Sequence, residues 1–161
     1  MPLEMETEAL PRPRELVPLI IIDEASGGSK WLVGRTKLTK MVFLAQKEAA
    51  PAFYMLAGPD EAYEFVPYHY GPFSSELLRD LEDLEQRGLI EISRRMLDSK
   101  GRAFEYLYQS TGLGRGVSWA THSTEAMWEI RTLAKKYAGV DRNRLVRYIY
   151  QRYPEAVRPA V

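Results

Sequence analysis

The chain has 161 residues, of which 45% are apolar and 27% are charged, and its formal net charge is zero. This length suits one domain with an appendage, and no stretch approaches the roughly 18 consecutive apolar residues of a membrane span, so we expect no membrane segment. The absence of cysteine excludes disulfides, thiol catalysis and thiolate metal sites. The first residues begin acidic and lack the order of a signal peptide, so we expect a cytoplasmic protein.

The zero net charge hides two regions of opposite sign. Residues 60–92 carry nine acids and two bases, whereas residues 131–152 carry seven bases and one acid. DNA-binding domains are usually basic because phosphate neutralisation supplies much of their affinity. A DNA-binding function for this chain would therefore depend on local basic patches rather than on the overall charge.

The first third of the chain predicts a tail followed by two helices. Residues 1–14 hold three prolines and little periodicity, which is typical of a flexible tail. An apolar run predicts a helix over 14–25, and a second helix is predicted from about residue 33 to Pro51. We expect residues 52–62 to form a loop. Four basic side chains lie mostly off the apolar face of the second helix, where we expect a solvated surface: Arg35, Lys37, Lys40 and Lys47.

The stretch 63–92 is built around one amphipathic helix, predicted over 74–87. Four leucines recur at helical spacing and give this helix an apolar face, namely Leu77, Leu78, Leu81 and Leu84. Ser74 or Ser75 can cap its first turn, and Gly88 suits a left-handed position at its end. Gly71-Pro72 predicts the turn that precedes it, and Pro67 before that turn indicates an edge strand.

Two strands follow this helix. Alternating residues predict strands over 89–96 and 103–108, joined by a polar turn over 97–102. A helix that ends at a glycine and leads into such a hairpin is typical of a winged helix-turn-helix. We therefore predict a mainly α fold with a small antiparallel β-hairpin (α+β), with a winged-helix domain over 15–116.

The remaining residues predict a helical extension over 117–161. The glycine-rich segment 111–116 resembles a flexible joint, and helices are predicted over 117–137 and 142–153. Both helices are rich in aromatic and aliphatic residues beside a domain that already has a core. Such helices either complete the core of the wing domain or form a dimer interface, and we expect the second, a homodimer.

Candidate catalytic groups are few. His69 lies between two tyrosines, and His122 precedes Ser123, but adjacency in sequence is not how hydrolytic triads are built. Glu82 and Asp83 point to different sides of their helix and cannot share a proton as a dyad. We expect a protein that is not an enzyme, with no cofactor and no metal site.

Three stretches, 33–47, 65–90 and 145–156, together resemble the YwgA-like family of bacteria and archaea. That family is in turn similar to the SocA-type antitoxin (Panacea) domain, through a K-L-x-K helix and a Tyr-Gly-Pro turn. Here these motifs stand as Lys37-Leu38-Thr39-Lys40 and Tyr70-Gly71-Pro72. The resemblance spans about three quarters of the chain and implies a winged-helix-like regulator. It transfers no functional residue.

The first functional hypothesis is a regulator that binds double-stranded DNA. In such folds the helix before the hairpin enters the major groove. Here five acids and one base would face the DNA from the helix over 74–87, which opposes insertion. The hairpin and the start of the second helix must then hold the phosphates. The candidate DNA-binding residues are Arg35, Lys37, Arg79, Arg94, Arg95, Lys100 and Arg102.

The alternative hypothesis is a protein-protein interaction module, either antitoxin-like or an adaptor. On this hypothesis the acidic face of the helix over 74–87 docks on the basic surface of a protein partner. Its candidate residues are Glu76, Asp80 and Asp83.

Overall fold

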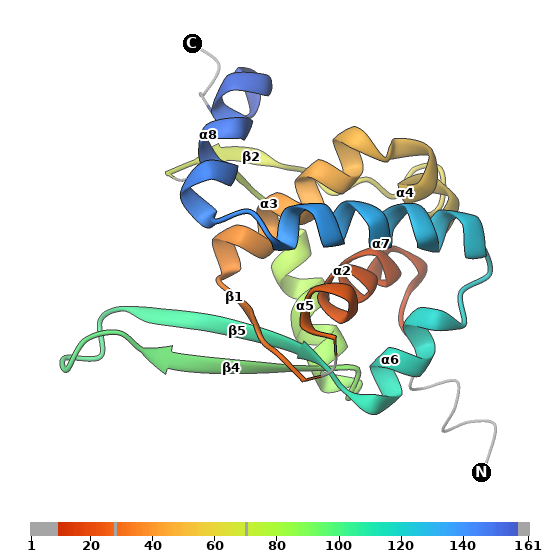
Figure 1. Ribbon diagram of the computed structural model, residues 1–161, viewed down its shortest axis with the longest axis horizontal. Helices are drawn as coiled ribbons and strands as arrows, with labels where there is room; N and C mark the ends of the chain where they lie inside the picture. The colour runs from red at the N-terminus through yellow and green to blue at the C-terminus, as the bar shows by residue number, and fades with distance from the viewer. Residues whose placement is uncertain (1–9, 28, 70, 158–161) are drawn as a thin grey trace.

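A computed structural model describes residues 10–27, 29–69 and 71–157, and most of these residues are helical (Figure 1). The α+β class predicted from sequence is confirmed: the small sheets are all antiparallel. The first half contains η1 (Pro13–Glu15), α2 (Leu16–Ser26), β1 (Leu32–Val33), α3 (Arg35–Glu48), α4 (Ala50–Ala57), β2 (Val66–Tyr68) and β3 (Gly71–Phe73). The second half contains α5 (Ser75–Gln86), β4 (Ile90–Met96), β5 (Phe104–Ser110), α6 (Gly112–Trp119), α7 (Thr124–Ala138), α8 (Arg142–Arg152) and η2 (Pro154–Ala156).

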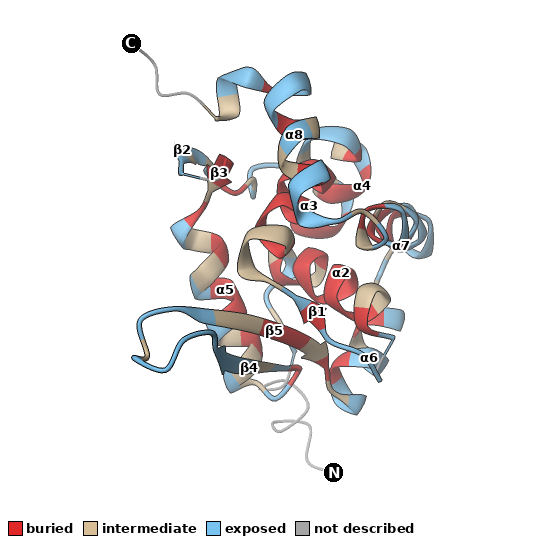
Figure 2. Ribbon diagram, turned by 60° about the vertical axis from the view of Figure 1, so that its left-hand side comes forward, coloured by how far each residue is buried: buried red, intermediate tan, exposed pale blue. Residues whose placement is uncertain are grey.

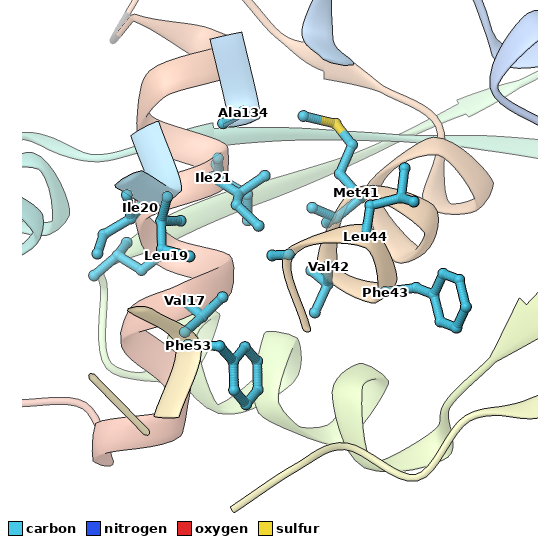
Figure 3. Packing of buried hydrophobic residues seen from close by; sticks show 14 of the residues in the cluster. Val17, Leu19, Ile20, Ile21, Met41, Val42, Phe43, Leu44, Phe53 and Ala134 are labelled. Atoms are coloured by element: carbon cyan, nitrogen blue, oxygen red, sulfur yellow. The ribbon is translucent and has the colours of Figure 1, made fainter. Parts of the chain in front are cut away.

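Helix α2 forms the centre of the core. It is apolar on nearly every side, as a helix surrounded by protein must be, and Pro18 is accommodated in its first turn. Helices α3, α4 and α7 pack around it. In Figure 3 the side chains of Val17 and Ile21 lie beside residues of α3 and α4, and all of them belong to one buried cluster.

Helix α5 confirms the predicted leucine face. Leu77, Leu81 and Leu84 are all buried. Ser74 caps the helix, since its hydroxyl accepts a hydrogen bond from the Leu77 amide at 3.2 Å. At the other end Gly88 has a φ of +76° and lets the Leu89 amide reach back to the Leu84 carbonyl at 3.0 Å. The chain then enters β4 directly.

Strands β4 and β5 form the predicted hairpin, and β1 pairs with the other side of β5 to give the order β1-β5-β4. Arg94 lies opposite Tyr106, and Arg95 lies opposite Glu105. The hairpin projects well beyond the helices (Figure 1), and the residues near its tip are exposed (Figure 2). A separate pair, β2 and β3, places Pro67 opposite Pro72 and lies near α8.

Two segments predicted as irregular are helical. Residues 50–57 form α4, because Pro51 sits in the first turn of that helix, where a missing N–H costs nothing, instead of ending α3. The segment predicted as a joint forms α6, capped by the Thr111 hydroxyl. Gly114 of α6 packs directly on the backbone of Leu89: a Cβ at this position would lie 1.8 Å from the Leu89 carbonyl oxygen. The helix predicted over 117–137 is thus two helices, α6 and α7.

The C-terminal helices belong to the same core as the rest of the chain. Ile130 and Ala134 of α7 and Leu145 and Ile149 of α8 are buried in the cluster that contains α2. Polar contacts add to this packing: Tyr137, Tyr148 and Tyr153 all donate to the carboxylate of Glu48 on α3. Most of the apolar residues of α7 and α8 on which the dimer prediction rested are therefore buried within the same chain.

Arg131 is also part of the interior, although its sequence position placed it in a basic region. Its guanidinium is buried, donates to Asp23 of α2 at 3.0 Å and to Ser118 of α6 at 2.8 Å, and lies 3.7 Å from the Trp119 ring. These contacts connect α7 to α2 and α6. Arg131 cannot contribute to a basic surface.

Candidate nucleic-acid interface

The acidic face of α5 is covered by the N-terminal segment. Asp80 is 1% exposed, and its carboxylate accepts hydrogen bonds from Arg14 Nε at 3.0 Å and from the Tyr63 hydroxyl at 2.6 Å. The Arg12 guanidinium binds the other carboxylate oxygen. The expectation of an exposed Asp80 is therefore wrong, because bases from the segment predicted as a tail neutralise it.

The other two acids of the proposed protein-binding face have internal partners too. Glu76 lies 3.6 Å from Arg14 and accepts a hydrogen bond from the Glu64 amide at 2.8 Å. Asp83 pairs with Arg87 one turn later, at 2.8 Å. Residues 10–14 of the predicted tail are thus held on the protein, while residues 1–9 lie outside the described residues.

A fourth acid of this region, Glu15, is fully buried. It accepts hydrogen bonds from the Arg12 amide at 2.9 Å and from the Arg12 guanidinium at 3.3 Å. Burial, and then a hydrogen bond shared with Asp83, raise the pKa of Glu15 to about 7. The same hydrogen bond lowers the pKa of Asp83. The N-terminal segment is therefore joined to α5 by the ion pairs of Arg12 and Arg14 with Asp80 and also by the contact of Glu15 with Asp83.

The neutralised acids change the character of α5. Its fully exposed positions form one stripe along the helix, made of Ser75, Arg79, Glu82 and Gln86. This stripe carries one base and one acid, rather than five acids and one base. The electrostatic objection to placing this helix beside phosphates therefore applies to Glu82 and, in part, to the half-buried Glu85, but not to the acids held by Arg14 and Arg87.

The hairpin presents three exposed bases whose side chains have no carboxylate partner among the described residues. Arg94, Lys100 and Arg102 are exposed at and near its tip, and Asp98 closes the turn by accepting from the Arg102 amide at 2.9 Å. Arg95 differs, since its guanidinium pairs with Glu105 on the neighbouring strand. Of the four predicted hairpin residues, Arg95 is the one already neutralised.

The two candidates at the start of α3 are partly engaged. The Arg35 guanidinium stacks on Tyr106 of β5, 3.7 Å from the ring centroid. Lys37 Nζ donates to the carbonyl of Ala138 at the end of α7, at 2.7 Å, and burial lowers its pKa. Lys37 therefore stabilises the C-terminus of α7 and is a weaker candidate for contact with a partner.

A groove of about 850 Å³ lies between the turn-proximal part of the hairpin, at Leu97 and residues 104–106, and the starts of α3 and α8. It brings together Arg35 and Lys37 of α3, Tyr106 of β5 and Arg142 of α8, with Glu105 and Asp141 also in its wall. The bases at the hairpin tip do not line it. Of the predicted DNA-binding residues, Arg35 and Lys37 line this groove, Arg79 lies on α5, and the others lie on the hairpin outside the groove lining.

The described ranges contain no group of three or more His, Asp or Glu side chains placed to hold a metal ion. Within the same ranges no helix is both long and apolar enough to cross a membrane. His122 packs in a loop, with Nε2 2.9 Å from the Met55 carbonyl oxygen.

Comparison with known proteins finds similarity to the uncharacterized protein YwgA of Bacillus subtilis (strain 168), with 36% identity over 83 residues. The matched stretch covers 52% of this chain and 43% of the relative. No family model matches the chain, and no solved structure matches it significantly. The similarity supports a relationship to YwgA-like proteins over about half of the chain.

Proposed function

We propose that this protein is a winged-helix DNA-binding protein, a cytoplasmic transcriptional regulator of the YwgA-like group. The order of elements supports the proposal. Helix α2, strand β1, helix α3, helix α5 and the β4–β5 hairpin follow one another as in a winged helix, with α4 and the β2–β3 pair inserted before α5. In this arrangement α5 is the helix that meets the major groove and the hairpin is the wing.

The observation that carries the proposal is the internal neutralisation of α5. Arg12 and Arg14 hold Asp80, and Arg14 and Arg87 lie beside Glu76 and Asp83. The helix can then approach phosphates with Arg79, Ser75 and Gln86, and Glu82 is the fully exposed acid that remains on this stripe. Arg94, Lys100 and Arg102 contact the DNA backbone from the wing. Phosphate contacts of this kind give affinity without sequence specificity.

The test is fluorescence anisotropy with random duplex DNA across a salt series. Replacing Arg94 and Lys100 by alanine should weaken binding to all sequences and lower the salt slope by about two units, roughly one for each lost phosphate contact. The matched control replaces Lys47 and Lys135, which are exposed on α3 and α7 away from the hairpin. It should leave the slope unchanged. Equal losses in both variants, or no binding by the wild type at low salt, would reject the proposal.

A protein partner is the second candidate, and the hairpin rather than α5 favours it. Met96, Leu97 and Phe104 are exposed there, next to the basic tip. An antitoxin-like or adaptor function would use this apolar surface. The acidic residues Glu76, Asp80 and Asp83 no longer motivate it, because each has a partner within the chain. On this second hypothesis the wild-type protein does not bind DNA. Replacing Leu97 and Phe104 by serine should then abolish its binding to the protein partner.

A further inference from the structure

Lys40 of α3 is a buried lysine without a counter-ion. Its side chain was expected on the solvated face of α3, yet the residue is only 2% exposed. Within residues 10–27, 29–69 and 71–157, its ammonium group has no ion pair and no hydrogen-bond partner. An isolated buried charge is strongly unfavourable. Burial, with a smaller contribution from the positive charge of Arg142, accordingly lowers the pKa of Lys40 to about 8.

The end of this side chain lies beside Gly71, the first residue of β3. Gly71 has a φ of +112°, and a Cβ at this position would lie 3.1 Å from Lys40 Cε and 3.2 Å from Nζ. Glycine therefore suits this position for two reasons: it adopts the positive φ, and its lack of a side chain leaves room for the ammonium group. The K-L-x-K helix and the Gly-Pro turn, 31 positions apart in sequence, meet at this contact.

A pocket of about 320 Å³ opens beside this contact. Lys40, Thr36 and Thr39 form its α3 wall, with Arg35 at the same wall, while Pro72 and Phe73 of β3 and Leu78 of α5 form an apolar wall. Among the residues that the structure describes, no acidic side chain lines the pocket. The charges that face Lys40 are thus Arg35 from its own helix and Arg142 from α8, both positive.

We propose that this pocket binds a small organic carboxylate. The carboxylate group pairs with the Lys40 ammonium and accepts hydrogen bonds from the threonine hydroxyls, which supplies the missing counter-charge. The apolar body of the ligand rests on Pro72, Phe73 and Leu78. A single negative charge matches one buried ammonium, whereas a phosphate dianion would lose more hydration than these donors return.

The size of the pocket agrees with this class of ligand. A volume of about 320 Å³ lies at the lower end of the roughly 300–1,000 Å³ of small-molecule sites. The phosphate of a DNA backbone is excluded on steric grounds, because it remains attached to a duplex that cannot follow it into a pocket whose lysine is only 2% exposed. The inference is therefore independent of whether α5 and the hairpin bind DNA.

The test uses the full chain, labelled with 15N, and titrates it with benzoate as the probe. Benzoate should shift the amide resonances of Thr36, Thr39 and Phe73, and benzamide, which has the same shape without the charge, should not. Lys40→Met should weaken benzoate binding at least tenfold. This variant should stay folded, with an equal or higher melting temperature, because methionine removes an uncompensated charge while it retains the length of the side chain.

Lys47→Met is the matched control, since it changes the same residue type on the exposed side of the same helix. It should bind benzoate as the wild type does. The proposal is overturned if benzoate leaves the pocket resonances unmoved, or if Lys40→Met binds it unchanged. Binding of inorganic phosphate in place of benzoate would overturn the choice of a carboxylate.

Discussion

Arg14 and Asp80 form an ion pair across 66 positions of sequence, with Arg14 Nε 3.0 Å from Asp80 Oδ2. The Arg14 guanidinium also stacks on Tyr63, 4.4 Å from its ring centroid, and Tyr63 donates to the same carboxylate oxygen. An acid that helical spacing places on the outer side of α5 is thereby enclosed. This relationship fastens the N-terminal segment to α5 and removes one negative charge from its surface.

Asp80→Asn should destabilise the fold. It removes the charge that compensates Arg14, and loss of one partner of a buried pair costs about 3–5 kcal/mol. We expect the free energy of unfolding to fall by an amount near the lower value, because Arg12 is partly solvated and Glu76 remains 3.6 Å from Arg14. Urea denaturation measures this change in the free energy of unfolding. The control Glu82→Gln, on the exposed stripe of the same helix, should change the free energy of unfolding by less than about 0.5 kcal/mol.

Stability should fall as pH rises from about 4.5 to about 7. The pKa of Glu15 is raised on folding from 4.5 to about 7, so the folded state holds the proton more tightly. That stabilisation is complete below the pKa of the unfolded glutamate and is lost as pH rises through about 7, with a limiting slope of about 1.4 kcal/mol per pH unit. The lowered pKa of Asp83 acts at lower pH, outside this window.

Glu15→Gln separates this contribution from those of other groups. Glutamine can donate to Asp83 and accept from the Arg12 amide, as the protonated acid does. Denaturant unfolding measured between pH 5 and 8.5, about 2 units either side of the raised pKa, should show a weaker pH dependence in the variant. Equal slopes in both proteins would show that Glu15 titrates normally.

Leu81→Ala should cost about 2–5 kcal/mol, the range for large-to-small changes in a core. Leu81 is buried among the apolar residues beneath α5. Arg79→Ala, two positions earlier on the exposed stripe, should cost less than about 0.5 kcal/mol. Similar melting curves for the two variants would contradict the assignment of faces.

The homodimer stays a prediction, but the interface that we expect for it is now a different surface. Trp119 and Trp128 are 42% and 51% exposed and form a T-shaped pair with ring centroids 5.2 Å apart. If the chain dimerises, this exposed tryptophan pair is the surface of α6 and α7 that we expect it to use. Trp128→Glu should then shift sedimentation from dimer to monomer. A wild-type monomer at high micromolar concentration would remove the prediction.

The helix over 74–87, its cap, its terminal glycine and the hairpin after it could all be predicted from the sequence. Each rests on neighbours a few positions apart: Ser74 caps Leu77, and Gly88 allows Leu89 to reach Leu84. The same local reasoning failed at Pro51 and at 111–116. A proline starts helices as readily as it ends them, and Gly114 is small because it lies against the Leu89 backbone, not because the chain bends there.

The sequence by itself determined the periodic faces, the turns and the α+β class, since these depend on short-range spacing and backbone preference. Only the tertiary structure decided which charged residues are exposed. Asp80, Lys40 and Arg131 stand at positions that spacing or composition assigns to the surface, and all three are buried. Whether a charge is buried depends on which distant segment docks on it, as Arg14 docks on Asp80. Such a contact is set by the packing of the whole chain, and no local pattern encodes it.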